Sequence, residues 1–307
     1  MQREYLSRRA FVGSASALAL LAAAPQRAVL AGEVSHSSPP RRMFKTLKIG
    51  MVRVEGDLTT KFKAAKRAGF DGIELNSPGI DVEATKAAIA ESGLVVDGSV
   101  CSTHWNIRHS SPDAAVRAQA LADLQTALRE THAVGGHTVL LVVGKGEDGT
   151  EEEVWQRSIA NIRQALPLCG ELGMTIAIEN VWNQFLYTHD GPDDQTADKF
   201  VKYVDEFDSP WVGMQFDIGN HWKYGDPASW IRQLGRRVVK LDIKGFSRAE
   251  QKFADITEDD LPWAEVRKAL DDINFHGWVA AEVGGGDEER LGKIAKQIDS
   301  ALNLSPG

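Results

Sequence analysis

The chain has 307 residues, of which 43% are hydrophobic, enough for one large core or two smaller ones. Acidic residues outnumber basic ones by 43 to 35, and no basic block follows residue 42, which argues against nucleic acid or an anionic membrane as a partner. The two cysteines, Cys101 and Cys169, lie in separate segments without C-x-x-C spacing, so neither a disulfide framework nor a zinc finger is expected.

The first 31 residues have the pattern of an export signal. Arg8 and Arg9 precede a small, apolar stretch over 14–24 that is short for a membrane span, and Val29 to Ala31 offers a cleavage site. This predicts a cleaved twin-arginine signal over 1–31, an exported, periplasmic location and no stable membrane association after cleavage. An uncleaved anchor is the alternative. Residues 32–46, which include adjacent prolines, are expected to form a linker.

From Leu47 onward, apolar runs alternate with amphipathic segments. Capping signals support the helix starts: Asp57, Ser111 before a proline, and Thr150 with Glu153 as a capping box. Helices are predicted within 57–69, 81–93, 111–135, 150–173, 196–207, 226–235, 262–273 and 287–302. Strands are predicted over 48–54, 70–75, 94–100, 137–143, 174–179, 211–217, 238–242 and 277–282, and residues 245–261 form a longer connection.

Eight strand and helix units predict an α/β protein with a single (β/α)₈ TIM barrel over 47–307. A doubly wound open sheet is the competing architecture, and it would need a nucleotide-binding fingerprint that the sequence lacks. In such a barrel, the groups that carry chemistry lie at the carboxyl ends of the strands.

Four consecutive predicted strands end in a carboxylate: Glu179, Asp217, Asp242 and Glu282. Four like charges repel one another unless a cation lies between them, and oxygen ligands suit a hard divalent ion. We therefore expect one divalent metal, Mn or Mg, with Co and Zn as alternatives. The competing interpretation is that each acid is a solvated strand-end residue in a separate loop.

Several motifs resemble the sugar phosphate isomerase/epimerase family, a TIM-barrel group akin to xylose isomerase that includes ketose 3-epimerases and L-ribulose-5-phosphate 3-epimerases. The motifs are IENVWNQFL at 178–186, DSPWVG at 208–213, FDIGN at 216–220, WIRQLG at 230–235 and KLDIK at 240–244. The resemblance is specific from Met174 onward and is mainly one of fold before that residue.

The resemblance implies that Glu179, Asp217, Asp242 and Glu282 are the metal ligands. The family usually has histidine at the position of Asp242, so this chain's ligands would all be oxygen, which favours hard cations. The resemblance also implies that Glu179 and Glu282 are the catalytic acid and base. One carboxylate would remove the proton next to a sugar carbonyl, and the other would return a proton to the opposite face of the enediolate.

The substrate contacts implied by the resemblance fall on Asn220 and Arg248; because the family often has histidine at the first position, the adjacent His221 is a further candidate. The remaining substrate-binding predictions are residues of the barrel rim: Glu74, His104, Trp182 and Lys244. Trp105 is another rim candidate, and for both tryptophans core packing is an alternative to stacking on a sugar.

The sequence therefore predicts a metal-dependent sugar isomerase or epimerase acting on a keto-sugar or related carbohydrate. A lyase or hydrolase of 3-keto-glycosides with the same metal and base is the alternative, and an exported, non-catalytic sugar-binding barrel is a third hypothesis. An endonuclease of abasic sites is disfavoured, because that chemistry needs a histidine-rich zinc cluster and a basic groove. The expected partner is a small carbohydrate, and rim aromatics leave a homo-oligomer open.

Overall fold

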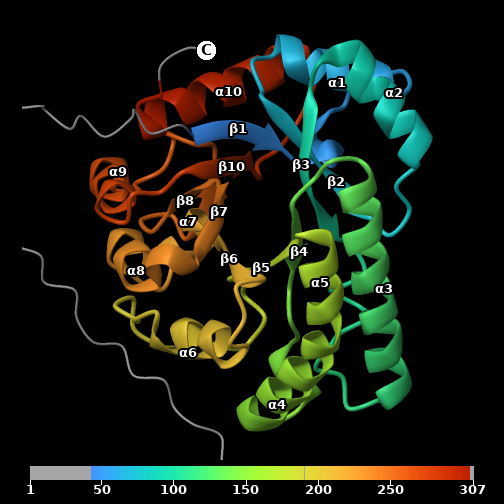
Figure 1. Cartoon of the computed structure of the whole chain (residues 1–307). Coiled ribbons are helices and arrows are strands. Elements are labelled where there is room, and N and C mark those ends of the chain that lie inside the picture. Colours follow the sequence, from blue (N-terminus) through green and yellow to red (C-terminus); the bar gives the residue numbers. More distant parts are fainter. Residues whose placement is uncertain (1–42, 190, 305–307) are drawn as a thin grey trace, which may run out of the picture. The chain divides into compact units, whose positions relative to one another are not determined.

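The structure is a computed structural model that describes residues 43–189 and 191–304. Its main sheet has eight parallel strands in the order β1-β10-β7-β6-β5-β4-β3-β2. The sheet curls round until its edge strands meet at a parallel bridge between Lys48 and Glu74. Figure 1 shows the strands surrounded by helices. The predicted (β/α)₈ barrel is confirmed, and the predicted export signal lies outside the described residues.

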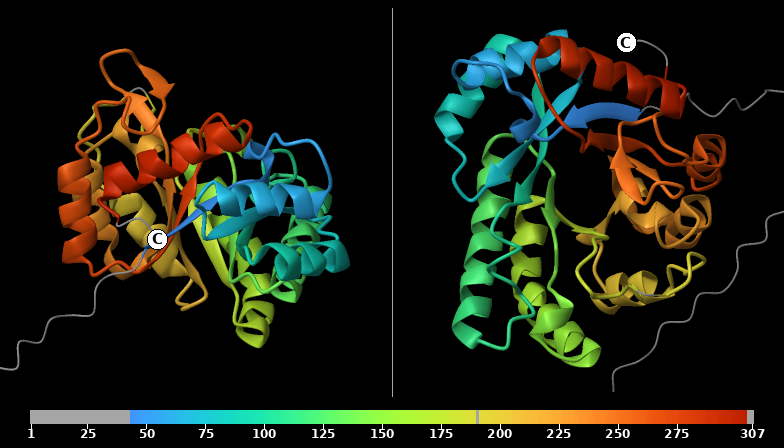
Figure 2. Two further views of the ribbon diagram at one scale, coloured as in Figure 1. Left: turned by 90° about the horizontal axis from the view of Figure 1, so that it is seen from above. Right: turned by 180° about the vertical axis from the view of Figure 1, so that it is seen from behind.

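The strands follow one another around the barrel almost in chain order. Their bounds are β1 Met43–Leu47, β2 Gly72–Ser77, β3 Val95–Cys101, β4 Thr138–Leu141, β5 Thr175–Glu179, β6 Val212–Asp217, β7 Val238–Ile243 and β10 Gly277–Ala281. The first and last strands pair in parallel, so β1 lies beside β10 and near the final helix (Figure 2).

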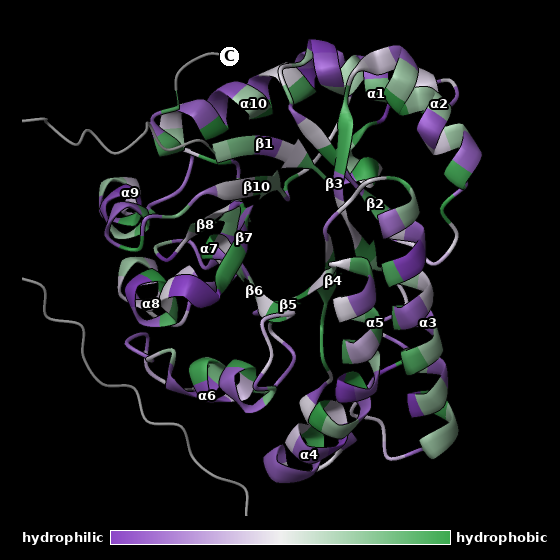
Figure 3. Ribbon diagram, viewed as in Figure 1, coloured by the Kyte–Doolittle hydropathy of each residue, from purple (hydrophilic) through white to green (hydrophobic). Residues whose placement is uncertain are grey.

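The larger outer helices are α1 Leu58–Arg67, α2 Val82–Ser92, α3 Ala114–Ala133, α4 Glu151–Ile162, α5 Leu166–Leu172, α6 Asp198–Glu206, α8 Pro227–Leu234, α9 Trp263–Asp272 and α10 Glu288–Leu302. The predicted caps at Asp57 and at Thr150 with Glu153 are present. Helix α8 carries both hydrophobic and hydrophilic stretches (Figure 3) and buries Trp230, Ile231 and Leu234. No helix among the described residues is both long and apolar enough to cross a membrane.

Three parts of the sequence-based prediction were wrong. The first strand is Met43–Leu47 rather than 48–54, so the barrel begins inside the segment predicted as linker. Helix α3 is capped by Asp113, whose side chain accepts from the Ala115 N–H, rather than by Ser111. The connection over 245–261 contains an antiparallel hairpin, β8 Gly245–Ser247 and β9 Lys252–Ala254.

A short helix directly follows strand β6. After β6 the chain turns at once into the one-turn-and-a-half helix α7, Ile218–Trp222, whose N-cap is Asp217. Gly219 in this helix lies against Lys244, where an added Cβ would approach the Lys244 carbonyl oxygen to 2.5 Å. A side chain at position 219 would therefore displace the start of the β8–β9 hairpin.

Candidate functional site

Four carboxylates gather at the carboxyl ends of four neighbouring strands. Glu179 ends β5, Asp217 ends β6, Asp242 lies in β7, and Glu282 follows β10 directly. Asp217 and Asp242 are direct partners in the register of their strands. One oxygen from each of the four residues lies within 4.8 Å of the others. The alternative of scattered, solvated acids is therefore wrong, because three of the four are buried and all four converge.

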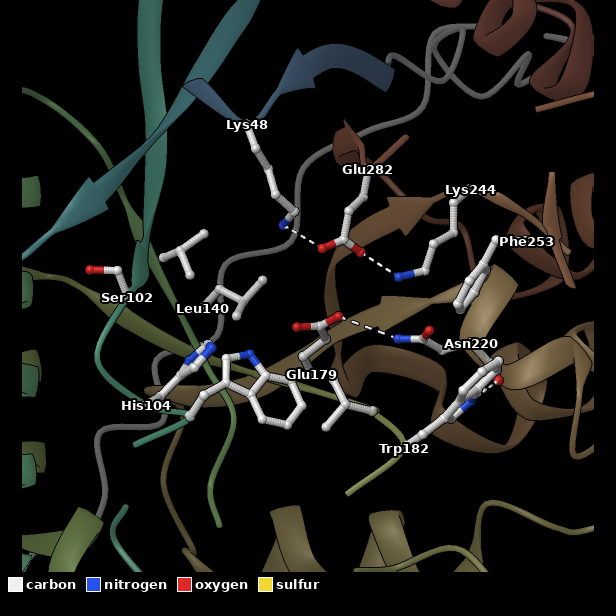
Figure 4. A pocket seen from close by; sticks show the side chains of 13 residues that line it. Lys48, Ser102, His104, Leu140, Glu179, Trp182, Asn220, Lys244, Phe253 and Glu282 are labelled. Atoms are coloured by element: carbon white, nitrogen blue, oxygen red, sulfur yellow. Dashed lines mark hydrogen bonds and ion pairs between the residues drawn. The ribbon is translucent and has the colours of Figure 1, made fainter. Parts of the chain in front are cut away.

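Two lysines reach into this acidic cluster (Figure 4). The Lys244 ammonium lies 2.8 Å from Asp217 and 2.6 Å from Glu282. The Lys48 ammonium lies 3.2 Å from Asp242 and 3.9 Å from Glu282. Glu282 therefore lies between two ammonium groups, whereas Glu179 accepts a hydrogen bond of 3.5 Å from the Asn220 side-chain amide.

A second charged layer lies deeper in the barrel. Lys240 and Glu74, both with no exposed side-chain surface, form an ion pair of 2.6 Å, and Lys240 also contacts Asp97. Lys48 extends from the upper layer to Glu74 at 3.0 Å. Gln215 donates to Asp242 at 2.9 Å and to Glu74 at 3.3 Å. Because Lys240 and Asp242 alternate along β7 and Lys244 directly follows this strand, all three project into the barrel.

The arrangement fits a divalent cation. The two layers contain six carboxylates and three ammonium groups, so full ionisation leaves an excess of three negative charges. Like charges this close in a buried site destabilise the ionised forms, and a bound divalent ion would offset most of the excess. The four converging donors are all carboxylate oxygens, the type that hard cations prefer. Glu179, Asp217, Asp242 and Glu282 are thus the residues that could hold such an ion.

The acid cluster divides into carboxylates with raised and lowered pKa values. Burial, together with the repulsion of neighbouring acids, raises the pKa of Asp217 to about 7 and that of Asp242 to about 6. Burial followed by the charge of Glu282 raises the pKa of Glu179 well above its ordinary value. Burial also acts to raise the pKa of Glu282, but Lys48 and Lys244 outweigh it and lower that pKa. Glu179 therefore binds its proton more tightly than Glu282 does.

The acid cluster opens into a cavity of about 380 Å³, a size suited to a small ligand. Glu179, Glu282, Lys48 and Lys244 line it together with Val100, Ser102, His104, Trp105, Leu140, Val181, Trp182, Asn220 and Phe253. Figure 4 shows Glu282 and Glu179 facing the same space from different strands. A small ligand in this cavity would therefore lie next to both glutamates.

His104 lines the cavity as a neutral imidazole with a defined proton position. Its Nδ1 accepts a hydrogen bond of 3.1 Å from the Val142 backbone N–H, so the ring proton resides on Nε2. Burial, reinforced by the charge of Lys48, lowers the pKa of His104 to about 3. His104 can therefore donate one hydrogen bond to a ligand oxygen from Nε2 without carrying charge.

Four of the predicted substrate-binding residues line this cavity: His104, Trp182, Asn220 and Lys244. Trp182 is half-buried, stacks on Phe253 with ring centroids 4.8 Å apart, and donates from its indole nitrogen to the Asn220 carbonyl oxygen. The Asn220 amide donates to the Asn180 carbonyl oxygen at 3.0 Å, which places it beside Glu179. Trp105, the other rim candidate, also lines the cavity and is 44% exposed.

Three predicted substrate-binding residues do not line the cavity. Glu74 lies in the deeper charged layer, where two lysines contact it. His221 has no exposed surface; its ring packs 3.7 Å from that of Trp230, and Nδ1 hydrogen-bonds to the Tyr187 hydroxyl. Arg248 turns outward, stacks over the Trp222 ring and donates to the carbonyl oxygens of Trp222, Asp193 and Gly225. Arg248 is therefore a loop-holding residue in this structure.

Two prominent cavity residues, Lys48 and Phe253, were missed from the sequence. Placing the first strand over 48–54 put Lys48 at the wrong end of the barrel, whereas it directly follows β1. The alternation Lys45-Thr46-Leu47-Lys48 was the available signal, because Thr46 and Lys48 share the inward face. Phe253 was hidden because the β8–β9 hairpin is short and was predicted as an irregular connection.

The comparisons with known proteins agree with the fold and with the resemblance seen in the sequence. The chain is 26% identical over 234 residues to a D-psicose 3-epimerase of Enterocloster bolteae, covering 70% of this chain and 72% of that protein. It is 24% identical over 201 residues to an L-ribulose-5-phosphate 3-epimerase of Salmonella paratyphi A, covering 60% and 67%. A crystal structure of a D-tagatose 3-epimerase-like protein superposes with a TM-score of 0.70 at 17% identity, covering 85% and 98%.

The family described as xylose isomerase-like TIM barrel matches residues 62–303, a range that includes all four converging carboxylates and the strands that carry them. The match covers far more than half of the chain. This chain therefore belongs to the xylose isomerase-like TIM barrel family.

Proposed function

We propose that this protein is a divalent-metal-dependent sugar epimerase or isomerase that acts on an unphosphorylated keto-sugar by proton abstraction next to its carbonyl. The observation that carries the proposal is the pair Glu179 and Glu282, which face one cavity within a cluster of four converging carboxylates. Two curated relatives of the chain are sugar 3-epimerases, which supports this class of reaction.

The chain's own groups account for the proton transfers. One glutamate removes the proton from the carbon beside the carbonyl, and the electron pair of that C–H bond moves to the carbonyl oxygen to form an enediolate. The other glutamate delivers a proton to the opposite face, which inverts the carbon. A divalent ion held by Glu179, Asp217, Asp242 and Glu282 would supply Lewis acidity that makes this C–H more acidic. His104 Nε2–H can hold a sugar oxygen during the transfers.

The cavity favours a sugar without a phosphate. Among the described residues that line the cavity, the cationic side chains are Lys48 and Lys244, and each already contacts at least two carboxylates. Arg248, a predicted substrate contact, is turned to main-chain carbonyl oxygens. The proposed export by the twin-arginine route agrees with a free sugar, because sugar phosphates are chiefly cytoplasmic.

Solvent deuterium exchange tests the proposal. The Mn-loaded protein should incorporate deuterium from heavy water at the carbon next to the carbonyl of an unphosphorylated keto-sugar, observed by NMR. E179Q and E282Q should each lower this rate about 10²–10⁴-fold, because each removes a proton-transfer group. E83Q is the matched control, since the Glu83 side chain is 86% exposed and lies on α2, and it should retain the wild-type rate.

Metal content is measured on each variant, so that loss of the ion is distinguished from loss of the acid or base. Exchange that survives in both E179Q and E282Q at full metal content would contradict the proposal. Release of a C1 substituent from a 3-keto-glycoside would instead identify the lyase, and sugar affinity without any exchange in the wild type would identify a binding protein.

A further inference from the structure

Exposed large hydrophobic side chains are concentrated at the mouth of the cavity. Among the described residues there are three: Val95 and Trp105, each 44% exposed, and Phe253, 48% exposed. Trp105 and Phe253 both line the cavity, whereas Val95 begins β3 at the amino end of that strand. Exposed apolar groups that gather around one cavity mark a binding surface.

Contacts within the protein hold these aromatic rings in place before any ligand arrives. Phe253 stacks on Trp182 at an interplanar angle of 16° and packs edge to face on Phe246 across the hairpin. Trp105 packs edge to face on His104, with ring centroids 5.7 Å apart. His104 is itself held by the Val142 N–H. Rings fixed in this way lose little conformational entropy when a ligand binds.

The inner and outer parts of the cavity therefore differ in the side chains that line them. Its inner part has Glu179, Glu282, Lys48 and Lys244, which suit the carbonyl and hydroxyl groups of one sugar. Its outer part has the rings of Trp105 and Phe253, which suit the apolar face of a second ring. The two parts meet at Phe253, because the Lys244 ammonium lies 5.0 Å from the centroid of its ring. A monosaccharide that occupies the inner part leaves the outer aromatic surface unused.

We propose that the substrate is a keto-sugar glycoside, in which the anomeric carbon carries a second ring that binds against Trp105 and Phe253. This inference rests on the proposed function for the reacting sugar and adds the class of its substituent. Trp105 and Phe253 are specificity-determining residues in this scheme, and the aromatic surface recognises an aryl group or the apolar face of another sugar.

Binding of matched ligands to the Mn-loaded, full-length protein tests the inference independently of turnover. Phenyl and methyl 3-keto-glucosides, as both anomers, are titrated calorimetrically. The phenyl glycoside of one anomer should bind about tenfold more tightly than its methyl counterpart, as expected for one aromatic stacking contact. W105A and F253A should each reduce this ratio several-fold, and W105F should retain most of it.

The control variant is V95A, which removes the third exposed hydrophobic side chain; Val95 begins β3 and does not line the cavity, so the ratio should stay unchanged. Equal affinity for the two glycosides, no measurable binding of either, or a ratio unaffected by W105A and F253A would overturn the inference. A change of oligomeric state in these variants, measured by sedimentation, would also overturn it, because the rings would then contact a second copy of the chain. A retained phenyl preference without deuterium exchange would instead refute only the proposed function.

Discussion

Of the three lysines inside the barrel, Lys48 pairs with the largest number of carboxylates. Its ammonium contacts Glu74, Asp242 and Glu282, and the first two have no exposed side-chain surface. The acids around it outweigh the effect of burial and raise the pKa of Lys48 well above its ordinary value, so it stays charged. Replacing it with an apolar residue leaves buried carboxylates with less compensation, which is one of the costliest changes in a protein interior.

K48M should therefore lower the free energy of unfolding by about 3 kcal/mol, measured by urea denaturation in the presence of a chelator. The matched control is K63M: Lys63 pairs with Glu91 on the surface, with side chains 41% and 57% exposed. Such a pair contributes at most about 1 kcal/mol. A K48M protein as stable as K63M would show that the interior acids do not depend on this lysine.

At the scale of elements, one carboxylate joins the loops that follow β3 and β4. Asp148, in the 3₁₀ turn Gly146–Asp148, accepts three hydrogen bonds from Arg108, at 2.7, 2.9 and 3.2 Å, and one from the Ser110 hydroxyl. These contacts hold the segment that begins with His104 and Trp105. Burial acts to raise the pKa of Asp148, but the hydrogen bonds of Arg108 and Ser110 outweigh it and lower that pKa.

D148N should lower the free energy of unfolding by about 2 kcal/mol at neutral pH, because hydrogen bonds to a charged group are lost. A lowered folded-state pKa gives stability that is present above the ordinary value of 3.8 and is lost as the pH falls through the folded value. The difference between wild type and D148N in thermal melting should therefore shrink on acidification. A difference independent of pH would contradict this origin.

At the scale of the whole molecule, the barrel's stability should depend on metal and pH together. The raised pKa values of Asp217 and Asp242, about 7 and about 6, mean that the metal-free protein loses stability as the pH rises through this range, where both acids ionise against their neighbours. A bound divalent ion stabilises the ionised forms and adds the free energy of binding.

Chelation should therefore lower the melting temperature more above neutral pH than in mild acid, measured by scanning calorimetry with Mn²⁺ or a chelator. The D217N and D242N variants should show a smaller metal-dependent difference, because each lacks one of the four converging carboxylates. A melting temperature insensitive to Mn²⁺ at every pH would rule out a stabilising ion at this cluster.

The sequence by itself determined the barrel and the converging acids. Apolar runs, caps such as Asp57 and the alternation of strands and helices are local signals, because each depends on neighbours a few residues away. The acids Glu179, Asp217 and Asp242 could be found for the same reason, since each is the last residue or the last but one of its strand and parallel strands bring their carboxyl ends to one rim.

Only the tertiary structure decided which polar groups share the cavity. Lys48 contacts Asp242, which lies 194 residues away in the sequence, and Lys240 contacts Glu74, which lies 166 residues away. Local sequence patterns carry no information about pairs so far apart in the chain. The direction of Arg248 depends on carbonyl oxygens that two other loops expose. Long, flexible side chains take the partners that packing offers them, so their roles follow from the fold and not from their place in a motif.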